Sequence, residues 1–389
     1  MRKVFTCGVG MTAFGKQPGR GLRSMALEAI DKALADGGLS QGRIERIYFG
    51  NAIAPTVLQQ DMIKGQVALR NHPLGHLPLI NVENACASGG SAFLMAVEAV
   101  GSGCVDVALA VGAEQMHHAD KSRAFNALRG STDVEDIGEY VPGELSANSL
   151  LMDFYAGVAQ DYLTHSDAVP GDFAAVSVKN RAHAAHNPLA QMVQPQTIEQ
   201  VLSGRIIVPP LTLAMCSPMT DGAAAALVCS ERVAAEMGRS RIEVRACQVA
   251  SGAGGQPVEG ASGKAYEYAA LGPNDLDLLE LHDAAAPAEL LQYHEIGLCP
   301  PGEGFRLLRD GITKLGGRTP VNCSGGLLSR GHALGATGLA QIHELVTQLR
   351  GQAGGRQVEG ARLAMAVNGG GWLDGTYALA IATILEKQA

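Results

Sequence analysis

Val105-Asp-Val-Ala-Leu-Ala-Val-Gly-Ala113 and Ala361-Arg-Leu-Ala-Met-Ala-Val-Asn-Gly369 are two similar strand-like segments far apart in the chain. A second pair is Arg43-Ile-Glu-Arg-Ile-Tyr-Phe-Gly-Asn-Ala52 and Asp275-Leu-Asp-Leu-Leu-Glu-Leu-His-Asp-Ala284. Each member of the second pair has a polar start, an apolar run and an end of small residues. Short apolar runs of this kind are typical of buried strands. The two pairs therefore indicate an internal duplication.

Two glycine-rich loops stand between the paired segments. They are Asn84-Ala-Cys-Ala-Ser-Gly-Gly90 in the first half and Asn322-Cys-Ser-Gly-Gly326 in the second. Apolar runs alternate with helix-like stretches along most of the chain, which is typical of α/β proteins. The sequence therefore predicts two related α/β halves that stack on one another and bring corresponding loops to one shared site.

The middle of the chain, about 117–240, interrupts this symmetry and is expected to form an inserted segment. Helices are expected near 148–165, 171–186 and 197–203, and long insertions of this kind usually cover or complete a site. We expect three domains. The N-terminal half spans 1–116 plus part of 205–235, the inserted loop domain spans 117–204, and the C-terminal half spans 236–389.

The composition narrows the function. Of the 389 residues, 47% are hydrophobic and 17% charged, which predicts a globular interior. The formal net charge is −8 and there is no basic run, so a nucleic-acid partner is not expected. No apolar stretch is long enough to span a bilayer, and the N-terminus does not have the pattern of a signal peptide. The eight cysteines form no CxxC pair, which predicts no metal site and favours a reduced, cytoplasmic setting.

Cys86 is the best candidate for a nucleophile. The segment 79–85 is expected to be a strand that enters a turn, and apolar residues 93, 94, 97 and 100 fall at helical spacing after it. Cys86 would then lie at a helix N-terminus, where the helix dipole stabilises a thiolate. We therefore expect a lowered pKa for the Cys86 thiol. Cys104, Cys229 and Cys247 lie in strand-like apolar runs and are expected to be core residues.

Four segments resemble the thiolase superfamily, in order along the chain. The segment around Cys86, 84–91, resembles the thiolase nucleophile segment, and 321–338, with His332, resembles the Gly-His-Pro loop. Leu281-His-Asp-Ala-Ala-Ala-Pro-Ala-Glu289 resembles the His-Asp-Cys-Phe segment of the sterol-carrier-protein type, and 215–225 resembles a structural segment of the family. The resemblance implies the thiolase fold, two βαβαβαββ halves stacked as α/β/α/β/α layers with an inserted loop domain.

The resemblance also implies roles for particular residues. His332 would take the proton from Cys86, as an imidazole next to a thiol can. The backbone N–H groups of Cys86 and Gly369 would form an oxyanion hole, which His282 would support through a further hydrogen bond. Asp283 and Asn368 are candidate supporting residues.

The sequence departs from the thiolases at the second cysteine, which normally removes the α-proton of the carbon nucleophile. Val367 and Ala284 occupy its two usual positions. Cys323 is a weak candidate for compensation. Ala333 replaces the usual proline after His332, which we interpret as a minor change in packing.

The resemblance predicts an acyltransferase with a coenzyme A thioester as substrate, no bound cofactor and a homodimer or homotetramer. The reaction would be Claisen condensation or thiolytic cleavage of a 3-oxoacyl-CoA. One alternative is acyl transfer to a non-CoA carbon acceptor, with a small OB-fold partner subunit. Another is a degenerate, non-catalytic subunit. A retro-aldolase is less favoured, because thiolase-like aldolases generally lack the nucleophile.

Overall fold

The computed structural model describes residues 2–135, 150–237, 241–252 and 255–388. Within these ranges, nine strands form one sheet in the order β3-β2-β4-β7-β1-β8-β11-β10-β9. In chain order their bounds are β1 Val4–Met11, β2 Arg46–Gly50, β3 Leu79–Val82, β4 Val107–Glu114, β7 Gly222–Ser230, β8 Ile242–Ser251, β9 Leu278–Glu280, β10 Leu363–Gly370 and β11 Leu379–Lys387.

The pairing of the strands repeats between the two halves, which confirms the duplication. In the first half β2 pairs in parallel with β3 and β4, and β7 pairs antiparallel with both β4 and β1. In the second half β9 and β10 are parallel, and β11 is antiparallel to both β10 and β8. Val321 bridges Leu279 in parallel and takes the place that β3 has in the first half. The halves join where β1 pairs with β8 over Phe5 and Thr6.

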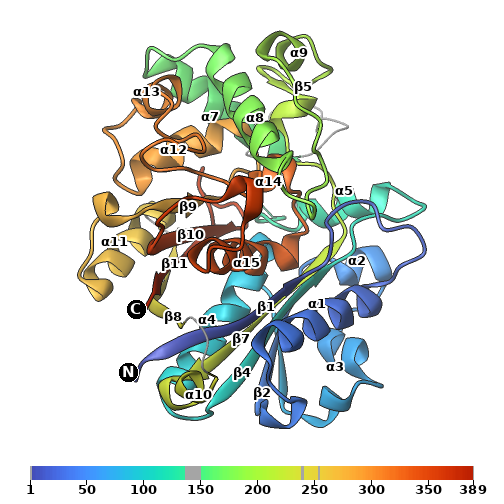
Figure 1. The fold of residues 1–389 in the computed structure, drawn as a ribbon. Helices are drawn as coiled ribbons and strands as arrows, with labels where there is room; N and C mark the ends of the chain where they lie inside the picture. The colour runs from blue at the N-terminus through green and yellow to red at the C-terminus, as the bar shows by residue number, and fades with distance from the viewer. Residues whose placement is uncertain (1, 136–149, 238–240, 253–254, 389) are drawn as a thin grey trace.

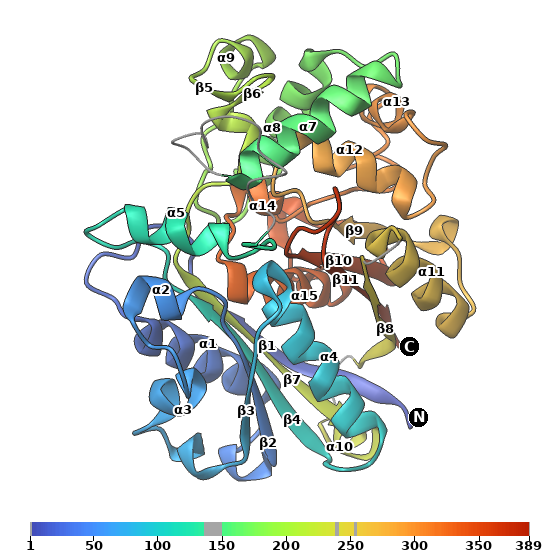
Figure 2. The same cartoon turned by 180° about the vertical axis from the view of Figure 1, so that it is seen from behind.

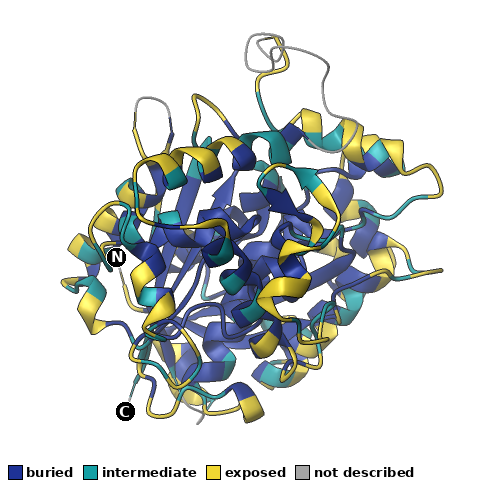
Figure 3. Ribbon diagram, turned by 90° about the horizontal axis from the view of Figure 1, so that it is seen from above, coloured by how far each residue is buried: buried dark blue, intermediate teal, exposed yellow. Residues whose placement is uncertain are grey.

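Helices separate and cover the two half-sheets, as Figures 1 and 2 show. Helix α1 (Leu22–Gly37) packs on β1 and β7, and α11 (Pro257–Ala269) packs on β8 and β11. Helices α4 (Ser88–Gly101) and α15 (Thr337–Leu349) contact each other between the half-sheets. The expected α/β/α/β/α layering is confirmed, and the strands are dark blue, or buried, through the centre of Figure 3.

Glycines allow the N-terminal ends of α4 and α15 to meet. A Cβ atom on Gly338 would lie 2.4 Å from the backbone nitrogen of Gly90, and one on Gly89 would lie 2.6 Å from the carbonyl oxygen of Gly335. No larger residue fits such close contacts between backbones. The loop that precedes α4 and the loop that precedes α15 are therefore held side by side.

The segment between β4 and β7 carries the three helices expected there, α7 (Leu150–Thr164), α8 (Pro170–Ala184) and α9 (Ile198–Leu202). Residues 148 and 149 of the first expected helix lie outside the described residues, as do 136–147 of the expected insertion. The division into three domains stays a prediction. The remaining elements are α2 Ala54–Leu58, α3 Lys64–Leu69, α5 Ser122–Arg129, β5 Ile206–Val208, β6 Leu211–Thr212, α10 Glu231–Glu236, α12 Ala286–Glu295, α13 Gly304–Arg309 and α14 Gly326–Ser329.

Helices α7 and α8 pack against α12, so the inserted segment covers the end of the second half from which the loop after β9 emerges. Within the described residues, no helix is long and apolar enough to cross a membrane.

Candidate active site

Cys86 lies in a tight turn between β3 and α4. Residues 85–87 form one 3-10 turn, and Ala85 before the cysteine has the left-handed φ of 47°. The Ser88 hydroxyl donates to the carbonyl of Ala85 at 2.7 Å and accepts the N–H of Asn84 at 3.0 Å. These bonds hold an unfavourable backbone conformation in place, as is common at functional sites. They fix Cys86 at the beginning of α4.

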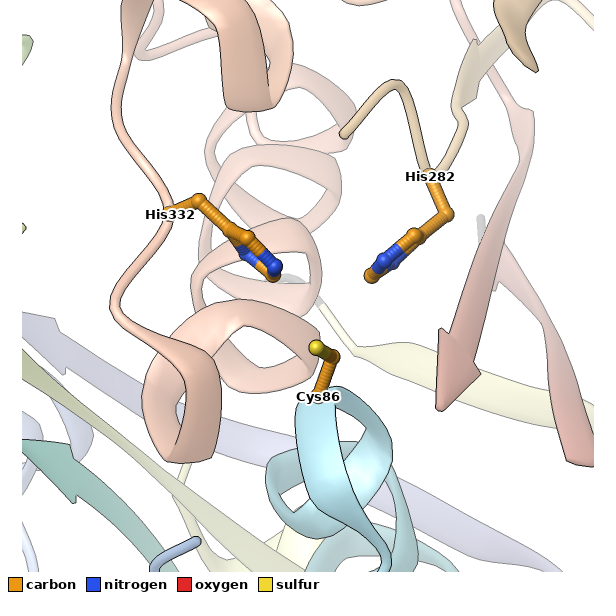
Figure 4. Close-up of side chains that lie close together, drawn as sticks. All are labelled: Cys86, His282 and His332. Atoms are coloured by element: carbon orange, nitrogen blue, oxygen red, sulfur yellow. The ribbon is translucent and has the colours of Figure 1, made fainter. Parts of the chain in front are cut away.

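Cys86, His282 and His332 come together from three separate loops (Figure 4). The thiol sulfur and one nitrogen of each ring all lie within 4.8 Å of one another. The centroids of the two imidazole rings are 5.2 Å apart, with the rings nearly perpendicular. Thiol and imidazole groups are also ligands of zinc, so the cluster could hold such an ion.

Thr337 fixes which nitrogen of His332 faces the cysteine. His332 Nδ1 lies 2.8 Å from Thr337 Oγ1, and the Thr337 hydroxyl donates its only proton to the carbonyl of Ala333 at 3.0 Å. The hydroxyl must therefore accept from Nδ1–H. Nε2 is then unprotonated and free to accept a proton from the Cys86 thiol. The backbone N–H of His332 is also held, by Thr220 Oγ1 at 3.0 Å.

Asn368 fixes the opposite tautomer at His282. Its side-chain amide nitrogen donates to the carbonyl oxygen of Cys86 at 3.1 Å, and a carbonyl oxygen can only accept. The same nitrogen lies 3.2 Å from His282 Nδ1, which must therefore accept the second amide proton. His282 then carries its proton on Nε2 and is a hydrogen-bond donor. The expected supporting role of Asn368 thus has a physical basis.

The backbone of His282 is held as firmly as its ring. Gln292 accepts its N–H at 2.9 Å and donates to its carbonyl at 2.8 Å, and the Tyr377 hydroxyl donates to the same carbonyl at 3.2 Å. Asp283 instead accepts from the N–H of Leu327 at 2.7 Å. Asp283 therefore anchors the beginning of α14, and the residue that contacts the ring of His282 is Asn368.

Both imidazoles are neutral in the resting site. Burial lowers the pKa of His282 to about 3, and burial together with His282 and Arg330 holds the pKa of His332 well below its usual 6.5. A neutral His332 can act as a base, and a neutral His282 with its proton on Nε2 can act as a donor.

The expectation of a lowered pKa for Cys86 is wrong. Burial, together with the nearby carboxylates of Glu114 and Glu83, raises the pKa of the Cys86 thiol to about 12. Cys86 is only 7% exposed, so loss of hydration outweighs the stabilisation that a helix terminus gives a thiolate. Cys86 is therefore a neutral thiol at rest and needs His332 to remove its proton during attack.

A cavity of about 210 Å³ opens beside the three side chains. Four aromatic residues line it, Phe125, Tyr155, Trp372 and Tyr377, and Arg205 is the one charged side chain among the described lining residues. Gly370 and Gly371 line it as well, one and two residues after Gly369. The role of Gly369 as an oxyanion donor stays a prediction.

Comparison with known proteins identifies the family. The thiolase N-terminal domain matches residues 4–201, and the thiolase C-terminal domain-like family matches residues 220–386. The chain belongs to the thiolase family. It is 38% identical to the benzoylsuccinyl-CoA thiolase subunit BbsB of Thauera aromatica, over 95% of both chains. It is 37% identical to an acetyl-CoA acetyltransferase of Methanothermobacter thermautotrophicus, over 95% of this thiolase and 97% of the relative.

Human sterol carrier protein 2 is 35% identical over 95% of this thiolase and 70% of its own length. Among solved structures, the Ltp2-ChsH2(DUF35) aldolase aligns with a TM-score of 0.80 and 25% identity, over 99% of this chain and 98% of its own. Human mitochondrial 3-ketoacyl-CoA thiolase in complex with CoA has a TM-score of 0.73 at 19% identity, which shows the shared fold.

This thiolase has no cysteine at either of the two positions where other thiolases carry their second catalytic cysteine. Ala284 lines the cavity, whereas Val367 is fully buried in the core of the second half. Cys323 is fully buried and does not line the cavity, and burial raises the pKa of its thiol well above 9. The structure therefore gives no support for the idea that Cys323 replaces the missing second cysteine. Cys216 does line the cavity, but its thiol donates to the carbonyl of Thr212 at 3.5 Å and it lies outside the three-residue cluster.

Sequence patterns did not single out Thr337, Gln292 or Tyr377. Thr337 stands five residues after His332, a spacing that places no two side chains together in a regular helix. The other two reach His282 from α12 and from the loop after β10, so only the folded chain brings them there. Among the residues that hold the two histidines, only Asn368 had a sequence signal, because it stands directly before three glycines.

Proposed function

We propose that this protein is a thiolase-type acyltransferase that forms an acyl thioester on Cys86. The observation that carries the proposal is the pair of opposite tautomers beside the cysteine, with a proton acceptor on His332 and a proton donor on His282. A nucleophile, a base and an oxyanion donor within a few ångströms of one another are the groups that acyl transfer from a thioester needs.

In the first half-reaction, His332 Nε2 takes the proton of Cys86 as the sulfur attacks the thioester carbon. The negative charge that develops on the carbonyl oxygen is stabilised by His282 Nε2–H and by the backbone N–H groups of Cys86 and Gly369. The tetrahedral intermediate collapses, the bond to the coenzyme A sulfur breaks, and His332 returns the proton to the departing thiolate. The acyl group is left on Cys86.

The apolar and aromatic cavity favours an apolar acyl group. Arg205, an exposed cation at the rim of the cavity, suits the phosphates of coenzyme A. We propose Claisen condensation or thiolysis of a 3-oxoacyl-CoA as the overall reaction, as the names of the thiolase and acetyltransferase relatives suggest. Retention of Cys86 supports acyl transfer over aldol cleavage. A cytoplasmic homodimer or homotetramer remains our expectation.

A second candidate is transfer of the acyl group to a carbon that is acidic by itself. Ala284 and Val367 favour it, because neither can remove an α-proton. The resemblance to the Ltp2-ChsH2(DUF35) aldolase supports a small OB-fold partner in either case.

Timing the two half-reactions separately tests the proposal. Rapid quenching with mass detection would follow acylation of Cys86 by acetyl-CoA, and release of product would follow acetoacetyl-CoA synthesis. We expect a fast acylation burst followed by slow condensation by the isolated chain. Brisk synthesis of acetoacetyl-CoA would show that the second cysteine is dispensable and would remove the case for a non-CoA acceptor. Absence of any acylation would contradict both candidates.

A further inference from the structure

The only tryptophan of the chain, Trp372, stands between two cavities. It lies in the loop between β10 and β11, is 7% exposed, and lines the 210 Å³ cavity beside Cys86. It also lines a second cavity of about 550 Å³. Among the described residues, Tyr377 is the other one that lines both cavities. The two rings therefore form the partition between the cavities.

Neighbouring rings hold the indole in place. Phe154 stacks on it with centroids 5.5 Å apart, and the edges of Tyr155 and Tyr377 meet it at 5.3 and 5.8 Å. The backbone N–H of Trp372 donates to the carbonyl of Ser131 at 2.8 Å. Aromatic packing of this kind adds to the burial of each ring. An acyl chain that reaches the indole therefore meets a fixed wall.

The chemistry changes on the far side of the wall. Asp153, Asp161, Glu259 and Glu295 line the second cavity, with no Lys or Arg among its described lining residues. Oε2 of Glu295 is buried without a hydrogen-bond partner in the structure. The cavity beside Cys86 is thus apolar, whereas the cavity behind Trp372 is acidic.

We propose that Trp372 ends the acyl pocket, sets the longest acyl group that Cys86 accepts, and keeps the acyl chain out of the acidic cavity. This inference rests on the proposed acyl transfer to Cys86. Short and compact apolar acyl groups fit in front of the indole, and a longer chain has to displace it. Without the indole, the two cavities join, and the far end of a long chain meets carboxylates.

The wild-type chain offers a direct test, because its tryptophan fluorescence comes from Trp372 alone. Acylation would be carried out with acetyl-, hexanoyl- and decanoyl-CoA, with mass detection of acyl-Cys86 in the same samples. We expect emission to shift as the acyl chain lengthens, up to the length at which acylation stops. Unchanged emission in fully decanoylated protein would overturn the proposal, since the chain would then lie elsewhere.

Trp372→Ala tests the wall itself. We expect the ratio of decanoyl to acetyl kcat/KM to rise about tenfold or more, because one methylene in an apolar pocket already changes this quantity by about 10-fold or more. Phe125→Ala is the matched control, since it removes an aromatic ring from the same cavity but not from the partition. Its chain-length limit should stay that of the wild type. An unchanged ratio in folded Trp372→Ala, or an equal rise in Phe125→Ala, would overturn the proposal.

A pair of charged substrates tests the acidic cavity. In Trp372→Ala, a long acyl-CoA with a terminal amine should outperform one of equal length with a terminal carboxylate, since the carboxylates attract the first and repel the second. Equal rates would remove that part of the proposal. If the Ala variant fails to fold, Trp372→Phe can be used instead, because it keeps a ring and opens the partition to a smaller extent. Absence of acetylation in the wild type would count against the proposed function. Normal acetylation of the wild type, together with an unchanged chain-length limit in Trp372→Ala, would count only against the proposed role of Trp372.

Discussion

Thr337→Val removes the hydroxyl that sets the tautomer of His332 and keeps the shape of the side chain. In the wild type this hydroxyl accepts Nδ1–H at 2.8 Å, and the bond strengthens when His332 becomes charged during attack. A hydrogen bond to a charged group contributes about 1.5–3 kcal/mol, and about 1.4 kcal/mol of barrier is a factor of ten in rate. We therefore expect acylation of Cys86 to slow by about 10- to 150-fold.

The assay is rapid-quench mass detection of acetyl-Cys86 during the first turnover. Thr337→Ser retains the hydroxyl and is the matched control, and we expect it to acylate within a few-fold of the wild type. Thr337 is fully buried and its hydroxyl also binds the carbonyl of Ala333, so thermal unfolding of each variant should be measured alongside. A folded Thr337→Val that acylates at the wild-type rate would refute the assignment of Nε2 as the proton acceptor.

The remaining predictions concern pH, the missing thiol and the coenzyme. The acylation rate should be flat from about pH 6.5 to 9 and should fall only at pH values well below 6.5. The reason is that the pKa of His332 is depressed and the pKa of Cys86 is raised to about 12. A rise in rate centred between pH 7 and 9 would instead indicate that the Cys86 thiol has an ordinary or lowered pKa. Ala284→Cys should speed acetoacetyl-CoA synthesis about 10-fold or more, as one added acid/base can, and Val367→Cys in the core should do less; no gain in a folded Ala284→Cys would mean that proton transfer is not the slow step. Arg205→Ala should raise the KM for acetyl-CoA several-fold but not that for acetyl-pantetheine, which lacks the nucleotide; an equal change for both would show that Arg205 does not bind the nucleotide phosphates.

The arrangement of the two halves could be predicted because it depends on patterns that repeat. The segments that end at Ala113 and Gly369 became β4 and β10, each between a parallel and an antiparallel neighbour. The glycines at 89 and 338 then allow the two helix ends to meet. Burial of an apolar strand and close packing at a glycine are local requirements, so a single sequence displays them.

The electrostatics of the site could not be predicted in the same way. The pKa of Cys86 depends on how completely the fold excludes water, and no local pattern reports this. The same is true of the tautomers, because Asn368 and Thr337 reach the two histidines through contacts that exist only in the folded chain. Asp283 adjoins His282 in sequence yet turns its carboxylate toward α14 instead.

Peptide mapping after brief exposure to acetyl-CoA tests the central claim most directly. The account predicts one acetyl group per chain, on the peptide that contains Cys86, absent from Cys86→Ala and formed about 10²- to 10⁴-fold more slowly in His332→Ala. Acetyl on another cysteine such as Cys216, or none at all in the folded wild-type protein, would contradict it.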